Sequence, residues 1–239
     1  TNKPILSLDK SDLLSDPFTA EIQKRYKQKC KELLQQTHNS LVNKINNGVR
    51  EIKNKKFMHT APHHDDIMLG YLPYIYHLVR IPENIHHFIY LTSGFTAVTN
   101  QYVLNLLENL QKHLHSTHFS DLMDQGYFKP DNYIATDRDV SYFLDGVASR
   151  SKTLKNEAHA RRILRDLVFL YEEESIAHLA DRINELIDYF STQYPGKKDL
   201  QHIQLLKGMI REWEADLLWA HFGFRSQAVK HLRLGFYKG

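Results

Sequence analysis

The fold of this chain is decided by the stretch KFMHTAPHHDD, residues 56–66, in which a short apolar run ends at two histidines and two aspartates. The run at 56–61 has the length and composition of a buried strand. Residues 65–79 are apolar at helical spacing, and Pro73 predicts a kink or a restart within them. A second strand, IHHFIYLT at 85–92, is β-branched and aromatic. Strand, helix and strand in succession predict a βαβ unit with a parallel strand pair and a right-handed crossover.

The residues before this unit predict a linker and a helical extension. Residues 1–16 are mostly polar, with one short apolar run at 4–6. From about 18 to 52 the pattern is helical, because apolar residues recur at spacings of three and four; they are Leu41, Ile45, Val49 and Ile52. The Asn47-Gly48 pair is a candidate interruption of this helix.

The residues after the unit predict a long helical stretch and then a third strand. An apolar stripe of Val103, Leu106, Leu107, Leu110 and Leu114 indicates one helix, and further helices are expected at about 155–170, 173–193 and 200–222. Residues 124–147 are predicted to be irregular, and 228–234 to be a strand. Because the strands lie early and late, we expect a parallel α/β domain at 56–239 with a helical insertion at about 97–200, preceded by the linker and extension at 1–55.

Composition and charge exclude several classes of function. Charged residues make up 25% of the 239, and a net charge of +3 is too small to argue for nucleic-acid binding. No apolar run approaches the roughly 18 residues of a membrane span, and the first residues do not form a signal peptide. The single cysteine, Cys30, cannot form an internal disulfide, which fits a reducing environment. We therefore expect a cytoplasmic protein that binds neither nucleic acid nor membrane.

The cluster at 63–66 has the composition of a metal site beside a general base. It is expected beyond the carboxyl end of a parallel strand, where open α/β sheets bind ligands. His63 and Asp66, three residues apart across the turn, can aim at one Zn²⁺ ion, and Asp65 is then free to take a proton from water. The alternatives are that an aspartate only caps the helix and that His64 is a surface residue. Nucleotide binding is disfavoured, because the turn has no Gly-rich phosphate loop.

Four segments resemble the LmbE-like, or PIG-L, zinc-dependent N-deacetylases. APHHDD at 61–66 looks like the family's Ala-Pro-His-Pro-Asp-Asp signature, and LTSG at 91–94 resembles the end of its second strand. REWEA at 211–215, with FGF at 222–224, resembles the family's Arg-rich, Glu-containing helix and the turn after it, and LRLGFY at 232–237 looks like the next strand. More narrowly, KPILSL at 3–8 and the helical insertion resemble the C-terminal half of long bacterial proteins that fuse a glucosamine-6-phosphate deaminase domain to an LmbE-like domain.

The resemblance implies a Rossmann-like parallel sheet and roles for four residues. By this comparison His63 and Asp66 are zinc ligands, Asp65 is the general base, and Arg211 contacts the substrate. The implied activity is a carbon–nitrogen hydrolysis that removes the N-acetyl group of an amino sugar.

The chain also departs from the family's pattern. His64 replaces the usual Pro, and Ile67 replaces the usual acidic residue. The family takes its third zinc ligand from a later segment like Pro-Asp/His-x-x-x-His, and no such segment appears in the sequence, so we expect an incomplete zinc site. His221 and His231 are candidate substitutes by position.

These departures keep a second function open, a non-catalytic regulatory or assembly module attached to an amino-sugar deaminase domain. The helices at 97–220 can also mediate homo-oligomers. The aromatic residues of 127–145 can either form a lid that stacks on a sugar or pack at the base of the insertion.

Overall fold

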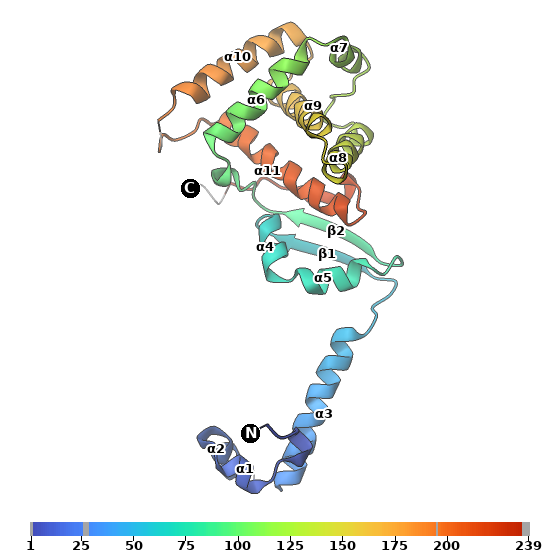
Figure 1. The fold of residues 1–239 in the computed structure, drawn as a ribbon, viewed down its shortest axis with the longest axis vertical. Coiled ribbons are helices and arrows are strands. Elements are labelled where there is room, and N and C mark those ends of the chain that lie inside the picture. The colour runs from blue at the N-terminus through green and yellow to red at the C-terminus, as the bar shows by residue number, and fades with distance from the viewer. Residues whose placement is uncertain (1, 26–28, 195, 236–239) are drawn as a thin grey trace. The chain divides into compact units, whose positions relative to one another are not determined.

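The computed structural model describes residues 2–25, 29–194 and 196–235, and the chain divides into two compact units, 1–53 and 54–239 (Figure 1). Phe236 and Tyr237, the end of the strand expected at the C-terminal side, lie outside the described residues.

The first unit is helical, and it includes part of the stretch that the sequence predicts as a linker. Its elements are η1 (Ile5–Ser7), α1 (Lys10–Leu14), α2 (Pro17–Arg25) and α3 (Cys30–Val49). The linker prediction is wrong at α1, because Asp9 caps this short helix by accepting hydrogen bonds from the backbone of Ser11 at 2.7 Å and Asp12 at 3.1 Å. The α3 helix runs through the Asn47-Gly48 pair without interruption.

The second unit contains a small open sheet of three parallel strands in the order β1-β2-β3. The strands are β1 (Lys56–Ala61), β2 (Ile85–Tyr90) and β3 (Val229–His231), and they pair with Ala61 opposite Tyr90 and Tyr90 opposite His231. The predicted parallel pair is confirmed, whereas the third strand is shorter than expected. Between β1 and β2 the chain forms α4 (His64–Gly70) and α5 (Leu72–Val79), so Pro73 marks a restart.

The sheet is held in place by α11 (Gln201–His221). In Figure 1 the strands β1 and β2 lie between α5 and α11. Trp219 of α11 is fully buried, its ring stacks on Phe88 with a centroid distance of 3.5 Å, and its indole N–H donates to the Tyr90 hydroxyl at 2.5 Å. The carboxyl end of β2 is thereby fixed against the helix.

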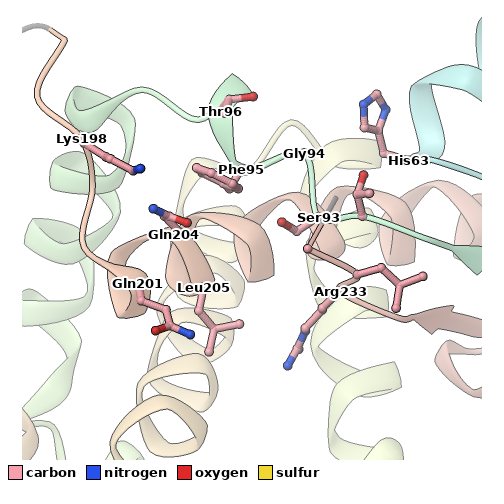
Figure 2. A pocket seen from close by; sticks show the side chains of 13 residues that line it. His63, Ser93, Gly94, Phe95, Thr96, Lys198, Gln201, Gln204, Leu205 and Arg233 are labelled. Carbon is pink, nitrogen blue, oxygen red and sulfur yellow. The ribbon is translucent and has the colours of Figure 1, made fainter. Parts of the chain in front are cut away.

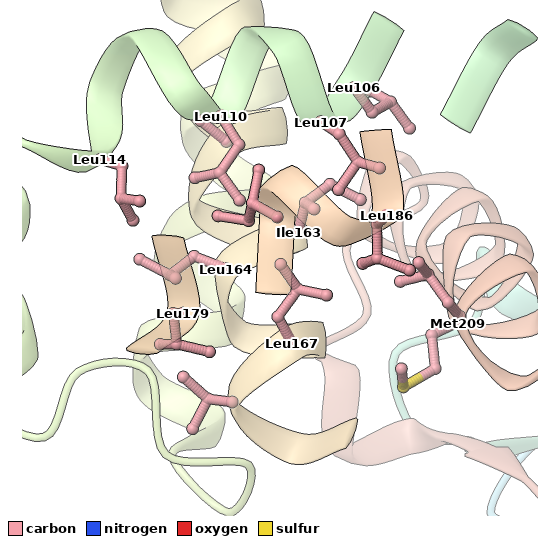
Figure 3. Close-up of a cluster of buried hydrophobic side chains, with 14 of the residues drawn as sticks. Leu106, Leu107, Leu110, Leu114, Ile163, Leu164, Leu167, Leu179, Leu186 and Met209 are labelled. Carbon is pink, nitrogen blue, oxygen red and sulfur yellow. The ribbon is translucent and has the colours of Figure 1, made fainter. Parts of the chain in front are cut away.

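The larger hydrophobic core of the unit is formed by helices. They are α6 (Asn100–Leu114), α7 (Thr117–Asp124), α8 (Tyr133–Ala148), α9 (Lys152–Tyr171), α10 (Ile176–Thr192) and the first half of α11. Two short 3-10 helices, η2 (Phe95–Ala97) and η3 (Ser226–Ala228), contribute no buried residue. The predicted apolar stripe of α6 is confirmed, since all five of its residues are buried. Figure 3 shows Leu107 and Leu110 of α6 beside Leu164 and Leu167 of α9.

The irregular stretch predicted at 124–147 is wrong, because most of it is the α8 helix. The buried face of α8 includes Asp139, which accepts hydrogen bonds from the Tyr127 hydroxyl at 2.6 Å and from Arg165 at 2.7 Å. A helix whose buried face carries polar residues has no continuous apolar stripe. The hydrophobic pattern of the sequence therefore did not indicate a helix here. Tyr127 and Phe128 are themselves buried, so these two aromatic residues pack in the core and do not form a lid.

Together these elements make the second unit a mostly helical α/β structure around a small parallel sheet. In the described ranges, none of the helices has both the length and the apolar character that crossing a bilayer requires.

Candidate functional site

The candidate site lies where β1 gives way to α4. Backbone pairing continues past the strand, because the Pro62 carbonyl accepts the Thr92 N–H at 2.9 Å. His63 precedes the first residue of α4, and its own N–H donates to Asp66 Oδ2 at 3.2 Å. Asp66 therefore closes the first turn of the helix and brings its carboxylate beside the His63 ring.

His63 and Asp66 form a pair of potential metal donors. His63 Nδ1 lies 3.1 Å from Asp66 Oδ2, yet this buried nitrogen makes no hydrogen bond of good geometry. Two ligand atoms bound to one tetrahedral zinc ion are separated by about 3.3 Å. The spacing of the two donors therefore fits a shared ion.

The His63 ring is held in place by the loop after β2. Gly94 has a φ of 63°, and a Cβ at this position would lie 3.2 Å from His63 Cδ2. Glycine therefore provides both the left-handed backbone and the close approach.

The described ranges offer no group of three or more histidine, cysteine, aspartate or glutamate side chains arranged to hold a metal ion. A catalytic zinc site normally has three protein ligands. His63 and Asp66 thus supply two of the three donors that such a site needs.

Asp65 lies on the same turn, with its Oδ2 3.9 Å from His63 Nδ1, and it connects His63 to a further group of charges. Arg211 of α11 donates to Asp65 Oδ2 and also to Glu214, and His64 Nε2 lies 3.2 Å from Asp65 Oδ1. Burial, and then the charge of Arg211, lowers the pKa of His64 to about 4, so this imidazole is neutral at pH 7. Burial raises the pKa of Glu214, an effect that Arg211 opposes.

The structure therefore brings all four predicted site residues to one end of the sheet. Arg211 is engaged there with Asp65, and Glu214 was missed by the sequence analysis, although its spacing of three from Arg211 puts both side chains on one face of α11.

The two substitute ligands considered from the sequence lie in different places. His231, on β3, helps line a small cavity of about 10 Å³ together with His63, His64 and Arg211. The His231 ring stacks on Tyr90, and its Nε2 lies 3.5 Å from Asp216 Oδ1. His221 instead ends α11, where its ring meets Phe222 edge-on.

A larger pocket of about 450 Å³ opens beside His63 (Figure 2). Its walls come from the loop 92–96, from 198–205 at the start of α11, and from 233–235. The volume lies in the range of about 300–1,000 Å³ that small-molecule sites occupy. The site thus combines two metal donors, an adjacent carboxylate and room for a small molecule.

Comparison of the chain with protein-family models, with curated proteins and with solved structures finds no match.

Proposed function

We propose that this chain contains an LmbE-like domain with a Rossmann-like sheet, and that it hydrolyses the N-acetyl group of an amino sugar with the help of zinc. The observation that carries the proposal is the 3.1 Å approach of His63 Nδ1 to Asp66 Oδ2 at the carboxyl end of a parallel strand, beside a pocket of small-molecule size.

In this proposal His63 and Asp66 hold the ion. A bound zinc ion supplies Lewis-acid chemistry, which lowers the pKa of water and polarises a carbonyl group. Asp65 accepts the proton of the water whose oxygen attacks the amide carbon. As the carbon–nitrogen bond breaks, Asp65 passes this proton to the leaving nitrogen, and acetate and a free amine result. Arg211, bound to both Asp65 and Glu214, orients the Asp65 carboxylate.

The neighbouring aspartates give a matched pair of variants that tests these roles. Asp65→Asn should retain the zinc content of the wild-type protein while lowering the rate of acetate release by about 10²–10⁴-fold, because it removes the base and leaves the donors. Asp66→Asn should lower the zinc content itself. Metal analysis and acetate release from N-acetylglucosamine derivatives measure both effects. An Asp65→Asn variant with full zinc and an unchanged rate would remove Asp65 from the mechanism.

The alternative is a non-catalytic regulatory or assembly module of an amino-sugar deaminase protein. It is favoured by the ion pair that already occupies Asp65, and by the absence of a third metal donor among the described residues. Protein without zinc that also releases no acetate when zinc is added would support this function over hydrolysis.

A further inference from the structure

The pocket beside His63 has walls suited to a sugar. Hydroxyl and amide side chains line it from two segments, the loop 92–96 and the start of α11; they are Thr92, Ser93, Thr96, Gln201 and Gln204. Phe95 adds one aromatic surface. Side chains of these kinds both donate and accept hydrogen bonds, as sugar hydroxyl groups require.

The charge of the pocket wall is positive. Within the described residues its lining has no carboxylate, and it has two permanent cations, Lys198 and Arg233. Arg233 is already neutralised, because its guanidinium binds Glu212 with two hydrogen bonds of 2.7 and 2.9 Å. The ammonium of Lys198 is therefore the charge that remains available to a ligand.

An exposed lysine is usually only solvated, but the segment that carries Lys198 is anchored over the pocket. The carboxylate of the next residue, Asp199, is bound by Lys207 at 2.6 Å, and its backbone carbonyl accepts a hydrogen bond from Gln204 at 2.8 Å. Asp199 is thus turned to Lys207 and does not pair with Lys198. Figure 2 shows Lys198 and His63 on opposite sides of the pocket.

We propose that this pocket binds an N-acyl amino sugar that carries an anionic substituent, with the anion beside Lys198 and the acyl amide beside His63. This inference rests on the proposed function, because it assumes that the acyl amide of the sugar reacts beside His63. Lysine recognises phosphate and carboxylate groups as a point charge, and a pocket without a carboxylate leaves that charge uncompensated. Phosphate and carboxylate substituents have the negative charge in common, and in this proposal that charge lies at the end of the sugar opposite the acyl amide.

The test compares binding of three probes by calorimetry: N-acetylglucosamine, its 6-phosphate and N-acetylmuramic acid. The wild-type protein should bind at least one anionic sugar about tenfold more tightly than the neutral sugar, and the preference should weaken as salt is added. The two anionic probes distinguish a phosphate from a carboxylate.

Lys198→Ala should abolish this preference by weakening the binding of the anionic sugar about tenfold, whereas Lys198→Arg should retain it. Lys197→Ala is the matched control, because Lys197 lies over the Tyr189 ring and does not line the pocket. Equal affinity for neutral and anionic sugars, no binding of any probe, or an equal loss in Lys197→Ala would overturn the inference.

These experiments test the proposed anionic ligand and the proposed hydrolysis independently of each other. Tight binding of an anionic sugar that depends on Lys198, without acetate release, would retain the pocket assignment and reject hydrolysis. Acetate release at the same rate from neutral and anionic sugars, with no effect of Lys198→Ala, would retain hydrolysis and reject the anionic substrate.

Discussion

Gly94 is the residue that lets the chain after β2 pass close to His63. We expect Gly94→Ala to lower the free energy of unfolding by about 1–2 kcal/mol, because alanine is strained at a φ of 63° and its methyl group would press on the His63 ring. Gly70→Ala is the control, since a Cβ there meets nothing within 4 Å, and it should be neutral or slightly stabilising. Urea unfolding measures both; equal stability of the two variants would contradict this account of Gly94.

Some contacts of the site residues could be predicted from the sequence, and others could not. The closeness of His63, Asp65 and Asp66 could be predicted because they lie within four positions directly after an apolar strand, so the turn itself brings them together. Glu214 was missed because it meets the turn only through tertiary contacts: it binds Arg211, which reaches Asp65 across 146 positions of sequence, and it lies 3.6 Å from His64 Nε2. Local patterns carry no information about such a partner.

Among the elements, α11 is the one that connects the site to the core, because consecutive residues point in different directions. Arg211 and Glu214 bind at the turn that carries Asp65, whereas Glu212 is buried at the edge of the small cavity beside His63 and binds Arg233. Burial alone would raise the pKa of Glu212, but Arg233, together with the charges of His231 and Arg162, outweighs it and holds that pKa below its ordinary value.

Arg233→Met should therefore destabilise the protein by about 2–3 kcal/mol, because it leaves a buried carboxylate without its main partner. The double variant Glu212→Met/Arg233→Met should recover at least half of this loss, since no unpaired charge then remains. Chemical unfolding of wild type, the two single variants Glu212→Met and Arg233→Met, and the double variant measures this; additive effects of the two substitutions would show that the pair is not coupled.

The elements were predictable to the extent that they bury apolar residues on one face. The strands β1 and β2 and the helix α6 satisfy that condition and were predicted. The α8 helix buries Thr136 and Asp139, so its buried face is partly polar. The polar partners that make such burial possible come from distant segments, which is why residues 124–147 looked irregular.

For the molecule as a whole, buried histidines predict a stability that depends on pH. His59 and His86 lie side by side on the sheet, with 3.0 Å between Nε2 and Nδ1, and both are buried. Burial, and then the charge of His86, lowers the pKa of His59 from 6.5 to about 4, and burial also lowers that of His86. Between these values the unfolded chain binds more protons than the folded one. The two neutral histidines therefore contribute fully to the free energy of unfolding above about pH 6.5. This contribution is lost as the pH falls toward 4.

The double variant His59→Phe/His86→Phe should flatten this dependence, because phenylalanine does not titrate and can keep the ring stack with Phe57 and Phe88. Urea midpoints from pH 4 to 8 measure it. The comparison with wild type is needed because Asp166, whose pKa burial raises to about 6, acts in the opposite direction in both proteins. Parallel curves for the two proteins would exclude the histidine pair as the source.

The packing of Trp219 on Phe88 and Tyr90 gives the protein an intrinsic optical reporter. The chain has two tryptophans, Trp213 and Trp219, and both lie buried on α11. Trp213 lies under the guanidinium of Arg162, and Trp219 lies against the sheet. Tryptophan fluorescence therefore reports on the environment of this one helix. A red shift of the emission maximum during denaturation would show when α11 separates from the sheet and the helical core.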